Sequence, residues 1–432
     1  MNGELSIGYK VKTLYNATVT VKKLLGEGGQ GYVYLVDYDG QEKALKWYKK
    51  GYMNQVGIPF YEHIKHNVIK KSPGAEFLWP QDITNWDDGT FGYIMDVRPQ
   101  GYYDVTDIML CKVRFKSYKT VIDAALHIIS AFRALHNAGY AYQDMNDGNF
   151  FINPQTGKVL ICDNDNVAAE GETTGIQGKP RYMAPEVVTK KNAPNSASDL
   201  FSMSVILYIL FCLNHPLEGK RYLEPGLPPE LQEKLYGTEP LFIMDKNDQR
   251  NGPHPVAHKN TLTVWPCLPS YMQDFFQEVF SQKSLLHPSC RPAEIEWLKV
   301  LTRFRSDIVE CSCGNEIFTK NGRPCKCDAC GRAARIPFRL DFSNYSIPAI
   351  PGSRIYRIQL GVCNQDAALT PVASVVSKPT GELGIRNVYS RHWDAVNTKG
   401  AAKKVAPKDV IPLKHGIRFT VESETISISQ NK

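Results

Sequence analysis

A glycine-rich segment near the start of the chain and a lysine on the next strand are the first residues whose types and spacing suggest chemistry. Residues 26–33 have the sequence Gly-Glu-Gly-Gly-Gln-Gly-Tyr-Val, which fits the pattern Gly-x-Gly-x-x-Gly-x-Val. Where side chains are missing, the backbone amides of a hairpin approach phosphate oxygens closely, and a lysine with a buried stem can hold phosphates beside them. The pattern predicts a phosphate site that includes Lys46, with a plain glycine turn and an exposed strand lysine as the alternatives. A dinucleotide site is not favoured, because strand-like YVYLVDYDG follows the glycines where such a site needs a helix.

The second group with chemistry in its spacing is a cluster of cysteines. Five of the eleven cysteines lie between Cys311 and Cys330. Cys311-Ser312-Cys313-Gly314 and Cys327-Asp328-Ala329-Cys330-Gly331 have the form of two zinc knuckles, whose glycines permit the left-handed backbone that turns amides toward sulfur. We expect a structural zinc ion, because four thiolates leave no open position. The expected ligands are Cys311, Cys313, Cys327 and Cys330, with Cys325 as the alternative to Cys327.

The composition is that of a globular protein without membrane-spanning segments. The chain has 432 residues, of which 43% are hydrophobic and 22% charged. Its first residues lack the apolar core of an export signal, and no run approaches the roughly 18 apolar residues of a spanning helix. The net charge of +7 comes without dense basic tracts, so nucleic acid is not favoured as a partner. Clustered cysteines without a disulfide pattern add to the prediction of a cytoplasmic protein that does not associate with membranes.

The order of the expected elements is a β-rich part followed by a helical part. Residues 10–48 alternate in character and are punctuated by glycine, which favours strands joined by tight turns. A helix is expected near 57–70, a strand at 91–97 and a long helix over 118–139. Helical sequence continues to about residue 305, and short strand-like runs return after the cysteines.

The segment after the long helix carries the most specific pattern. Tyr142-Gln143-Asp144-Met145-Asn146-Asp147-Gly148-Asn149 resembles the catalytic loop of protein kinases, His-Arg-Asp-x-x-x-x-Asn. After strand-like KVLIC comes Asp163-Asn164-Asp165, at the place of the family's Asp-Phe-Gly. The resemblance implies that Asp144 accepts the proton of the acceptor hydroxyl. It also implies that Asn149 and Asp163 hold magnesium, with manganese as the alternative ion.

Further matches follow in the order that the family has. Met183-Ala184-Pro185-Glu186 resembles the Ala-Pro-Glu that closes the activation segment, and Asp199-Leu200-Phe201-Ser202 resembles the start of the central large-lobe helix. Arg291 then resembles the arginine that pairs with the Ala-Pro-Glu glutamate. The ordered matches imply an α+β, two-lobed protein-kinase fold. The predicted domains are the small lobe (1–97), the large lobe (98–305), a zinc ribbon (306–335) and an all-β, sandwich-like domain (336–432).

The same resemblance assigns the ATP site. The partner of Lys46 is expected to be a glutamate on the small-lobe helix, and Glu62 is favoured over Glu76 because AEFLWP has the character of the following strand. The linker between the lobes would receive adenine through its backbone groups. The residues expected to bind ATP are Gly26, Glu27, Gly28, Gly29, Gln30, Gly31, Val33, Ala44, Lys46, Met95, Asp96 and Val97.

Three positions depart from the family pattern. Gln143 replaces the arginine that binds the phosphate of an activated loop, so control by phosphorylation at Thr173 or Thr174 is not favoured. Asn146 replaces a lysine that meets the substrate phosphate in serine/threonine-directed members. Asp165 replaces a glycine, and its carboxylate would either recruit a second metal or restrict movement of the loop.

The last hundred residues have the pattern of short strands. RIYRIQLG, LTPVASVV, GELGIRNVY, GIRFTVE and TISIS alternate like the strands of a sandwich. GELGIRNVYSRHWDAV and VIPLKHGIRFTV resemble a forkhead-associated domain, a phosphothreonine reader, with Arg386, Ser390 and Arg391 as candidate phosphate ligands. A plain sandwich that docks on the kinase or on a partner is the alternative.

The combination of segments resembles a narrower group of bacterial kinases. Residues 215–222, 235–251 and 294–301, followed by cysteine knuckles and a β tail, resemble kinases that accompany a von Willebrand factor A protein and a metal-dependent phosphatase in tellurite-resistance-type phosphorylation triads. The resemblance implies a von Willebrand factor A-type protein as the substrate and the phosphatase as the antagonist.

The expected function is an ATP- and magnesium-dependent serine/threonine protein kinase in a bacterial signalling or stress response. The retained Lys46, Asp144, Asn149 and Asp163 favour activity over the alternative, a pseudokinase-type scaffold whose β domain recruits phosphoproteins. The Ala-Pro-Glu segment and its arginine favour a protein acceptor over a small molecule.

Overall fold

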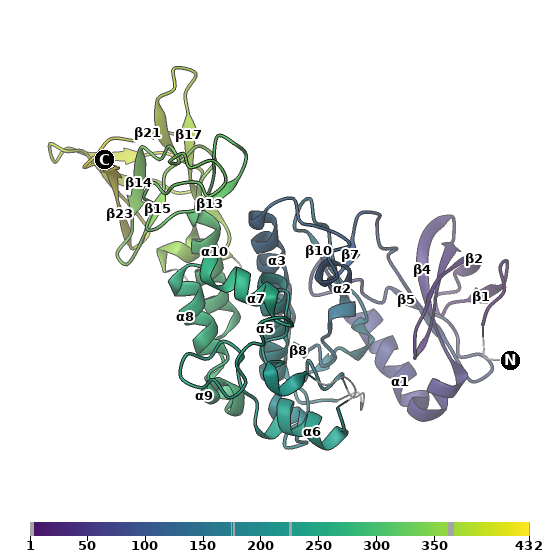
Figure 1. Ribbon diagram of the computed structural model, residues 1–432. Helices are drawn as coiled ribbons and strands as arrows, with labels where there is room; N and C mark the ends of the chain where they lie inside the picture. Colours follow the sequence, from purple (N-terminus) through teal and green to yellow (C-terminus); the bar gives the residue numbers. More distant parts are fainter. Residues whose placement is uncertain (1–3, 174, 176–177, 224–226, 362–366, 432) are drawn as a thin grey trace.

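The computed structural model describes residues 4–173, 175, 178–223, 227–361 and 367–431. An N-terminal sheet lies at one end of the molecule, the strands of the C-terminal segment lie at the other, and helices stand between them (Figure 1). Within this described part, no helix combines the length and the apolar character that crossing a bilayer requires.

The N-terminal sheet has antiparallel strands in the order β1-β2-β3-β4-β6-β5. Alternation places every second side chain in a core, where Val19 and Val21 of β2 join Tyr34 and Val36 of β3. The predicted strands over residues 10–48 and 91–97 are therefore confirmed. The strands are β1 (Lys10–Lys12), β2 (Thr18–Glu27), β3 (Gly31–Tyr38), β4 (Gln41–Tyr48), β5 (Asp82–Ile83) and β6 (Gly92–Met95).

Helix α1 (Lys50–Lys70) packs against this sheet through Met53, Phe60 and Ile64. It begins earlier than the predicted helix and is kinked at Gly57, whose φ of 65° is not helical. Pro59 follows the kink and lacks the N–H that would restore the regular hydrogen bond. The kink therefore changes the helical register, so side chains after Gly57 point in other directions than an unbroken helix would give them.

The helical part is organised around α5 (Ser196–Cys212), whose largely apolar sequence suits its burial on nearly all sides. Asn195 begins α5 with a capping box, in which Ser198 returns the hydrogen bond. The predicted long helix is confirmed as α3 (Tyr118–Asn137). The other helices are α2 (Val105–Met109), α4 (Pro185–Val188), α6 (Pro229–Glu233), α7 (Lys259–Val264), α8 (Ser270–Val279), α9 (Gln282–Leu286) and α10 (Glu294–Asp307). Along the chain between β6 and α4 lie the short strands β7 (Tyr103–Asp104), β8 (Tyr140–Ala141), β9 (Phe150–Ile152), β10 (Val159–Ile161) and β11 (Ala168–Ala169).

A two-stranded hairpin follows α10, with β12 (Ile308–Glu310) paired to β13 (Glu316–Phe318). The cysteine segments pack around it in a small core of their own. Glu316 of the hairpin reaches the helical part, where its carboxylate accepts hydrogen bonds from the backbone N–H groups of Tyr118 (2.5 Å) and Lys119 (3.3 Å). These amides open α3, so Glu316 satisfies donors that the helix itself leaves unpaired.

The C-terminal segment forms two antiparallel sheets, in the orders β15-β14-β23-β22-β19-β20 and β16-β17-β18-β21. Both sheets contribute to one apolar core, which contains Trp393 and Phe419 of the first sheet and Val372 and Ile385 of the second. The predicted strand RIYRIQLG is a strand only over Arg354–Tyr356 and then turns into a 3₁₀ helix. The strands are β14 (Phe338–Asp341), β15 (Ser346–Pro348), β16 (Arg354–Tyr356), β17 (Pro371–Ser377), β18 (Leu383–Asn387), β19 (Trp393–Val396), β20 (Ala402–Val405), β21 (Val410–Pro412), β22 (Arg418–Val421) and β23 (Glu424–Gln430).

The C-terminal sheets dock on the helical part. Ile358 and Ala368 belong to the same apolar core as the large helices. Arg303 of α10 places its guanidinium 3.8 Å from the ring centre of Tyr271 and 4.8 Å from that of Tyr345, which links the two parts by cation–π contacts. The expectation that the sandwich docks on the rest of the chain agrees with these contacts.

Candidate active site

The glycine-rich segment is the turn between β2 and β3. The Gly28 N–H donates to the Gly31 carbonyl (2.9 Å), which closes the hairpin. A Cβ atom added to Gly26, Gly28 or Gly29 would meet nothing within 4 Å, so one side of the hairpin is open for a ligand to approach the backbone. Gly31 is different, because a Cβ there would lie 2.3 Å from the Trp47 carbonyl oxygen of β4. Gly31 is therefore required by sheet packing, whereas the earlier glycines leave the backbone accessible.

Lys46 lies on β4 beneath this hairpin, with only 5% of its surface exposed. Its ammonium donates to Gln30 Oε1 in the hairpin (3.0 Å), to Asp163 Oδ1 (3.2 Å) and to Asp165 Oδ2 (2.7 Å). Burial disfavours the charge, but Asp163 and Asp165 outweigh burial and raise the pKa of Lys46 well above its usual value. Lys46 is thus a charged group held between the N-terminal sheet and the segment that follows β10.

The predicted ion pair between Lys46 and Glu62 is not formed. Glu62 projects from α1 toward solvent with 57% of its side chain exposed, and its carboxylate pairs with Lys65 (3.2 Å) on the same helix. The kink in α1 explains the difference, because the register after Gly57 turns His63 toward the site and Glu62 away from it. The lysine takes its buried carboxylate from Asp165 instead.

The predicted catalytic loop lies between β8 and the 3₁₀ turn η1 (Asp147–Asn149). Asp199 at the start of α5 holds this loop from below, since its carboxylate accepts from the N–H groups of Tyr142 (2.6 Å) and Gln143 (3.1 Å). The Asn149 amide donates to the carbonyl oxygen of Asp144 (2.7 Å), and this bond fixes the loop's curvature. The motif spacing therefore brings Asp144 and Asn149 together, as predicted.

Asp144 has the electrostatic properties of a group that accepts a proton near neutral pH. Burial raises its pKa, and the charges of Asp163 and Asp165 raise it further, to about 6, while Lys179 acts in the opposite direction. The Asn166 amide donates to Asp144 Oδ2 (3.2 Å) and orients the carboxylate. At neutral pH the carboxylate is mostly ionised and is still basic enough to take a proton, as a general base requires.

Asp163 follows β10 in a left-handed backbone conformation, with φ of 53°. This turn presents the carboxylate toward Lys46, and 44% of the side chain stays exposed. The Cys162 N–H donates to the Asn149 carbonyl (2.9 Å), which joins the end of β10 to the catalytic loop. The carboxylate oxygens of Asp163 and the amide oxygen of Asn149 are the hard donors that magnesium prefers, so the residues fit the predicted ion.

An apolar cluster lies beside these polar groups. Ala44, Met95, Val33 and Val97 were all expected to bind ATP, and they belong to one apolar cluster. Asp96 points its carboxylate to Lys43 (2.6 Å) at the edge of this cluster. Sequence reasoning missed Leu160 of β10 and Cys162 directly after it, which pack against the same cluster. Their proximity arises from tertiary packing, and no local signal marked them.

The segment after Asp165 is anchored at both ends. Gln143, at the place of the family's arginine, donates its side-chain amide to the Glu172 carbonyl (2.6 Å). Thr173 is exposed, and Thr174 lies outside the described residues. At the other end the predicted pair of Glu186 and Arg291 is confirmed as a buried, bidentate ion pair, with N–O distances of 2.7 and 2.6 Å.

Lys179 is a functional candidate that sequence reasoning missed. Its ammonium donates to Asn146 Oδ1 (3.1 Å) and lies 3.7 Å from Asp147 Oδ1, so it sits over the catalytic loop. Gly178 passes close to Asp144, because a Cβ there would lie 3.2 Å from the Asp144 carboxylate. The segment thus brings a cation to the position where the loop itself carries Asn146 in place of lysine.

The comparison with known families agrees with this geometry. A model of the protein kinase domain matches residues 19–281, which is more than half of the chain. The chain belongs to the protein kinase family. The kinase is 23% identical over 320 residues to serine/threonine-protein kinase Nek11 of Macaca fascicularis, in an alignment that covers 68% of this chain and 46% of that protein. It is 23% identical over 322 residues to protein kinase YegI of Escherichia coli O157:H7, with 69% and 47% covered.

A third relative is protein kinase C delta type of Mus musculus, which is 27% identical over 206 residues, or 46% of this chain and 30% of that protein. The kinase therefore spans about half the length, or less, of these curated relatives. The relatives include both bacterial and eukaryotic protein kinases.

The cysteine cluster of the kinase forms a separate site beside β12 and β13. The sulfur atoms of Cys311, Cys313, Cys327 and Cys330 all lie within 4.8 Å of one another. The sulfurs of Cys311 and Cys330 are 3.6 Å apart, and those of Cys313 and Cys327 are 3.7 Å apart. Tetrahedral zinc with bonds of about 2.3 Å needs sulfur–sulfur edges of about 3.8 Å, so the donors fit zinc.

The alternative ligand Cys325 is not part of this group, since its thiol contacts the Arg323 carbonyl (3.7 Å). The backbone N–H of Cys313 lowers the pKa of Cys311 to about 6, which favours the thiolate that metal binding requires.

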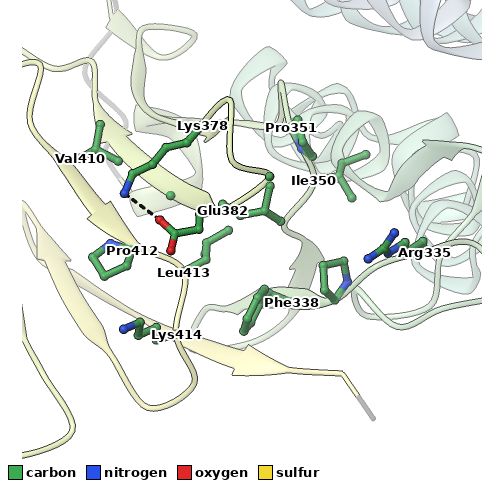
Figure 2. Close-up of a pocket in the computed structure, with 14 residues that line it drawn as sticks. Arg335, Phe338, Ile350, Pro351, Lys378, Glu382, Val410, Pro412, Leu413 and Lys414 are labelled. Carbon is green, nitrogen blue, oxygen red and sulfur yellow. Dashed lines mark hydrogen bonds and ion pairs between the residues drawn. The ribbon is translucent and has the colours of Figure 1, made fainter.

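The kinase also has a cavity of about 820 Å³ in its C-terminal part (Figure 2). Figure 2 shows Lys378 and Glu382 joined by an ion pair on one wall (2.9 Å), and Phe338 and Leu413 lie among the apolar lining. This cavity lies in the all-β part, far along the chain from the glycine-rich hairpin, and contributes nothing to the constellation around Lys46.

The candidate phosphothreonine-reading residues lie elsewhere on the same part. Arg386, Ser390 and Arg391 are exposed, and the cavity is lined by other residues. Arg391 places its guanidinium 6.0 Å from the ring centre of Tyr389.

Proposed function

We propose that this protein kinase transfers the γ-phosphoryl group of ATP to serine or threonine hydroxyls of a protein in the cytoplasm, with magnesium as its ion. The observation that carries the proposal is the convergence of four predicted groups: the buried Lys46 ammonium lies 3.2 Å from Asp163, and Asn149 is bonded to the backbone of Asp144. These groups come from segments far apart in the chain. Their meeting beneath the open glycine hairpin supports a site for a triphosphate.

The proposed reaction is an in-line displacement. Asp144 accepts the proton of the acceptor hydroxyl, the oxygen forms a bond to the γ-phosphorus, and the bond from that phosphorus to the bridging oxygen of ADP breaks. Lys46 holds the phosphates, and the hairpin amides orient them. Asn149 and Asp163 would hold magnesium, which when bound neutralises charge on the phosphates.

Lys179 is proposed to complete the acceptor side of the site. Serine/threonine-directed members carry a lysine where this loop has Asn146, and here Lys179 approaches that asparagine from the activation segment. A groove of about 560 Å³ beside this segment, with Met183, Val187 and Lys190 in its lining, has room for an acceptor polypeptide. These features support a protein acceptor.

The test is phosphate incorporation from labelled ATP into a generic protein acceptor. Asp144→Asn keeps the shape of the side chain and removes the base, so we expect a loss of at least about 100-fold. The matched control is Asp88→Ala, which removes a carboxylate that is 83% exposed on the N-terminal sheet. Equal incorporation by wild type and Asp144→Asn would reject the catalytic assignment and favour the alternative, a nucleotide-binding scaffold.

We also propose a structural zinc ion on Cys311, Cys313, Cys327 and Cys330. The supporting observation is the fit of their sulfur spacing to a tetrahedral ion. One zinc per chain by metal analysis, lost in Cys313→Ser but retained in Cys325→Ser, is the expected result.

For the physiological substrate we propose a von Willebrand factor A-type protein, with a metal-dependent phosphatase as the antagonist. The support is the resemblance of residues 215–222, 235–251 and 294–301 to kinases of such triads. The expected result is that a von Willebrand factor A protein encoded beside the kinase is labelled in preference to a generic acceptor and is dephosphorylated by the neighbouring phosphatase.

The phosphothreonine-reading role of the C-terminal part stays a proposal with the exposed Arg386, Ser390 and Arg391 as its candidates. Binding of phosphothreonine peptides over unphosphorylated ones, lost in Arg386→Ala, is the outcome that it requires.

A further inference from the structure

Asp165 is the most deeply buried carboxylate of the site, with 0% of its side chain exposed. Its Oδ2 accepts hydrogen bonds from the Lys46 ammonium (2.7 Å) and from the Tyr48 hydroxyl (2.5 Å). Lys46 and Tyr48 lie two positions apart on β4 and so present their side chains on the same face of the strand. Asp165 therefore sits behind the lysine, enclosed by β4, and does not face the open hairpin.

Helix α1 supplies no carboxylate to this arrangement. Glu62 is exposed and pairs with Lys65. In its place, His63 directs Nε2 at the backbone carbonyl of Asp165 (3.1 Å), and the Asn67 amide donates to the Val167 carbonyl (3.1 Å). Helix α1 thus holds the backbone of the segment that carries Asp165, while the charge comes from the segment itself.

Asp163 also contacts Lys46, but it is suited to a different task. Its side chain is 44% exposed, so its oxygens are available to an ion, whereas Asp165 is sealed. A buried ammonium without a fixed counter-charge is costly and free to change direction. When Asp163 binds magnesium, Asp165 is the carboxylate that stays paired with Lys46.

We infer that Asp165 is the positioning residue of this kinase: it aims the Lys46 ammonium at the phosphates, a role that α1 does not fill. The inference rests on the proposed function for the role of Lys46. Of the two roles expected for this extra carboxylate, it favours restriction of loop movement over recruitment of a second metal. A buried side chain with two donors on one oxygen holds the loop in place and is closed to an ion from solvent.

The arrangement joins two functions on one short turn. Asp163 precedes the 3₁₀ turn η2 (Asn164–Asn166), and Asp165 lies within it. The Asn164 amide fixes this turn by donating to the carbonyls of Leu78 and Ile161 (both 2.9 Å). The ion ligand and the lysine's partner therefore move as one unit.

The test compares Asp165→Asn with the matched control Glu62→Gln. Both substitutions replace a carboxylate by an amide, one in the buried pair and one on the surface of α1. For Asp165→Asn we expect kcat to fall about tenfold or more, the scale of loss for groups that orient a directly acting residue. Glu62→Gln is expected to stay within about twofold of wild type, because exposed pairs contribute little.

A second readout separates positioning from a general loss of folding. Lys46 acts on phosphates alone, so Asp165→Asn should lower the ratio of ATP affinity to adenosine affinity, whereas a loosened structure would weaken both. Asp165→Gly, which restores the residue that the family carries here, provides a second variant and should behave as Asp165→Asn does. Either variant is sufficient for the test if the other does not fold.

Two results would overturn the inference: an unchanged affinity ratio and kcat in whichever of the two variants folds, or a rise in both quantities, which would make Asp165 a restraint on Lys46. Failure of the proposed function is distinguishable from these. In that case the wild-type protein itself would bind ATP no better than adenosine, or would bind ATP and transfer no phosphate.

Discussion

His136 of α3 lies under the catalytic loop between two carboxylates, and substituting it should weaken folding in a pH-dependent way. Its Nε2 lies 3.1 Å from Asp199, the residue that holds the loop amides, and its Nδ1 contacts Glu294 of α10. Burial disfavours the charged imidazole, but the hydrogen bonds to Asp199 and Glu294 outweigh burial and raise the pKa of His136 to about 9. His136 is therefore charged at neutral pH and neutralises a pair of buried acids.

The magnitude follows from this pKa. At about 1.4 kcal/mol per pKa unit, a rise from 6.5 to about 9 corresponds to about 3 kcal/mol of stability. Because the pKa is higher in the folded state, this contribution is complete below 6.5 and is lost as the pH rises through about 9. His136→Gln should thus lower the free energy of unfolding by about 3 kcal/mol more at pH about 6 than at pH about 9.5.

Urea unfolding of wild type and His136→Gln at the two pH values measures the difference. The control is His127→Gln on the same helix, since His127 bonds to the Gly157 carbonyl and not to an acid. This variant measures how much stability is lost when a histidine of α3 without an acidic partner is replaced. If the difference in unfolding free energy between wild type and His136→Gln were as large at the higher pH as at the lower, the reasoning would be refuted, because the charge would then contribute nothing.

Three further outcomes are expected. Lys179→Met should move the acidic limb of the kcat/KM profile to higher pH, because Lys179 lowers the pKa of Asp144 and its removal lets that pKa rise above about 6; an unmoved limb would contradict the contact. Arg291→Met should cost about 3–5 kcal/mol in thermal or urea unfolding, because it strands a buried carboxylate; a loss under about 1 kcal/mol would argue against the pair. Chelation of the metal should make the segment 306–335 of the wild-type protein sensitive to trypsin, and Cys330→Ser should be sensitive without a chelator. Equal protection of this segment in untreated wild type, chelated wild type and Cys330→Ser would count against a structural zinc.

Local patterns predicted the parts of the site that contiguous residues create. The hairpin, the catalytic loop and the turn at Asp163 are short segments in which spacing decides geometry, and the alternation over residues 10–48 predicted the strand that carries Lys46. The pairing of Glu186 with Arg291 was also predicted, although the two are 105 residues apart, because each lies in a recognisable segment of the family.

The partner of Lys46 could not be found in the same way. Helical periodicity predicted α1, but the direction of its side chains depends on a backbone rotation at Gly57 that composition does not specify. Asp165 lies 119 residues from Lys46, and its burial arises only when the segment after β10 folds against β4. Lys179 was missed for the same reason, since an exposed lysine in a polar segment carries no signal until the loop beneath it is in place. For the cysteines, by contrast, the spacing already favoured Cys327 over Cys325, and the sulfur positions agree with that choice.

The carboxylate of Glu316 makes the hairpin after α10 part of the catalytic framework. It lies outside the matched region 19–281, yet it binds the first amides of α3, the helix whose other end leads into the catalytic loop. A recombinant fragment that stops at residue 305 would leave those amides to water and remove a negative charge from the positive end of the helix dipole. The shortest fragment suited to biochemistry therefore extends through the cysteine segments, because Glu316 of the β12–β13 hairpin ties this part of the chain to the start of α3.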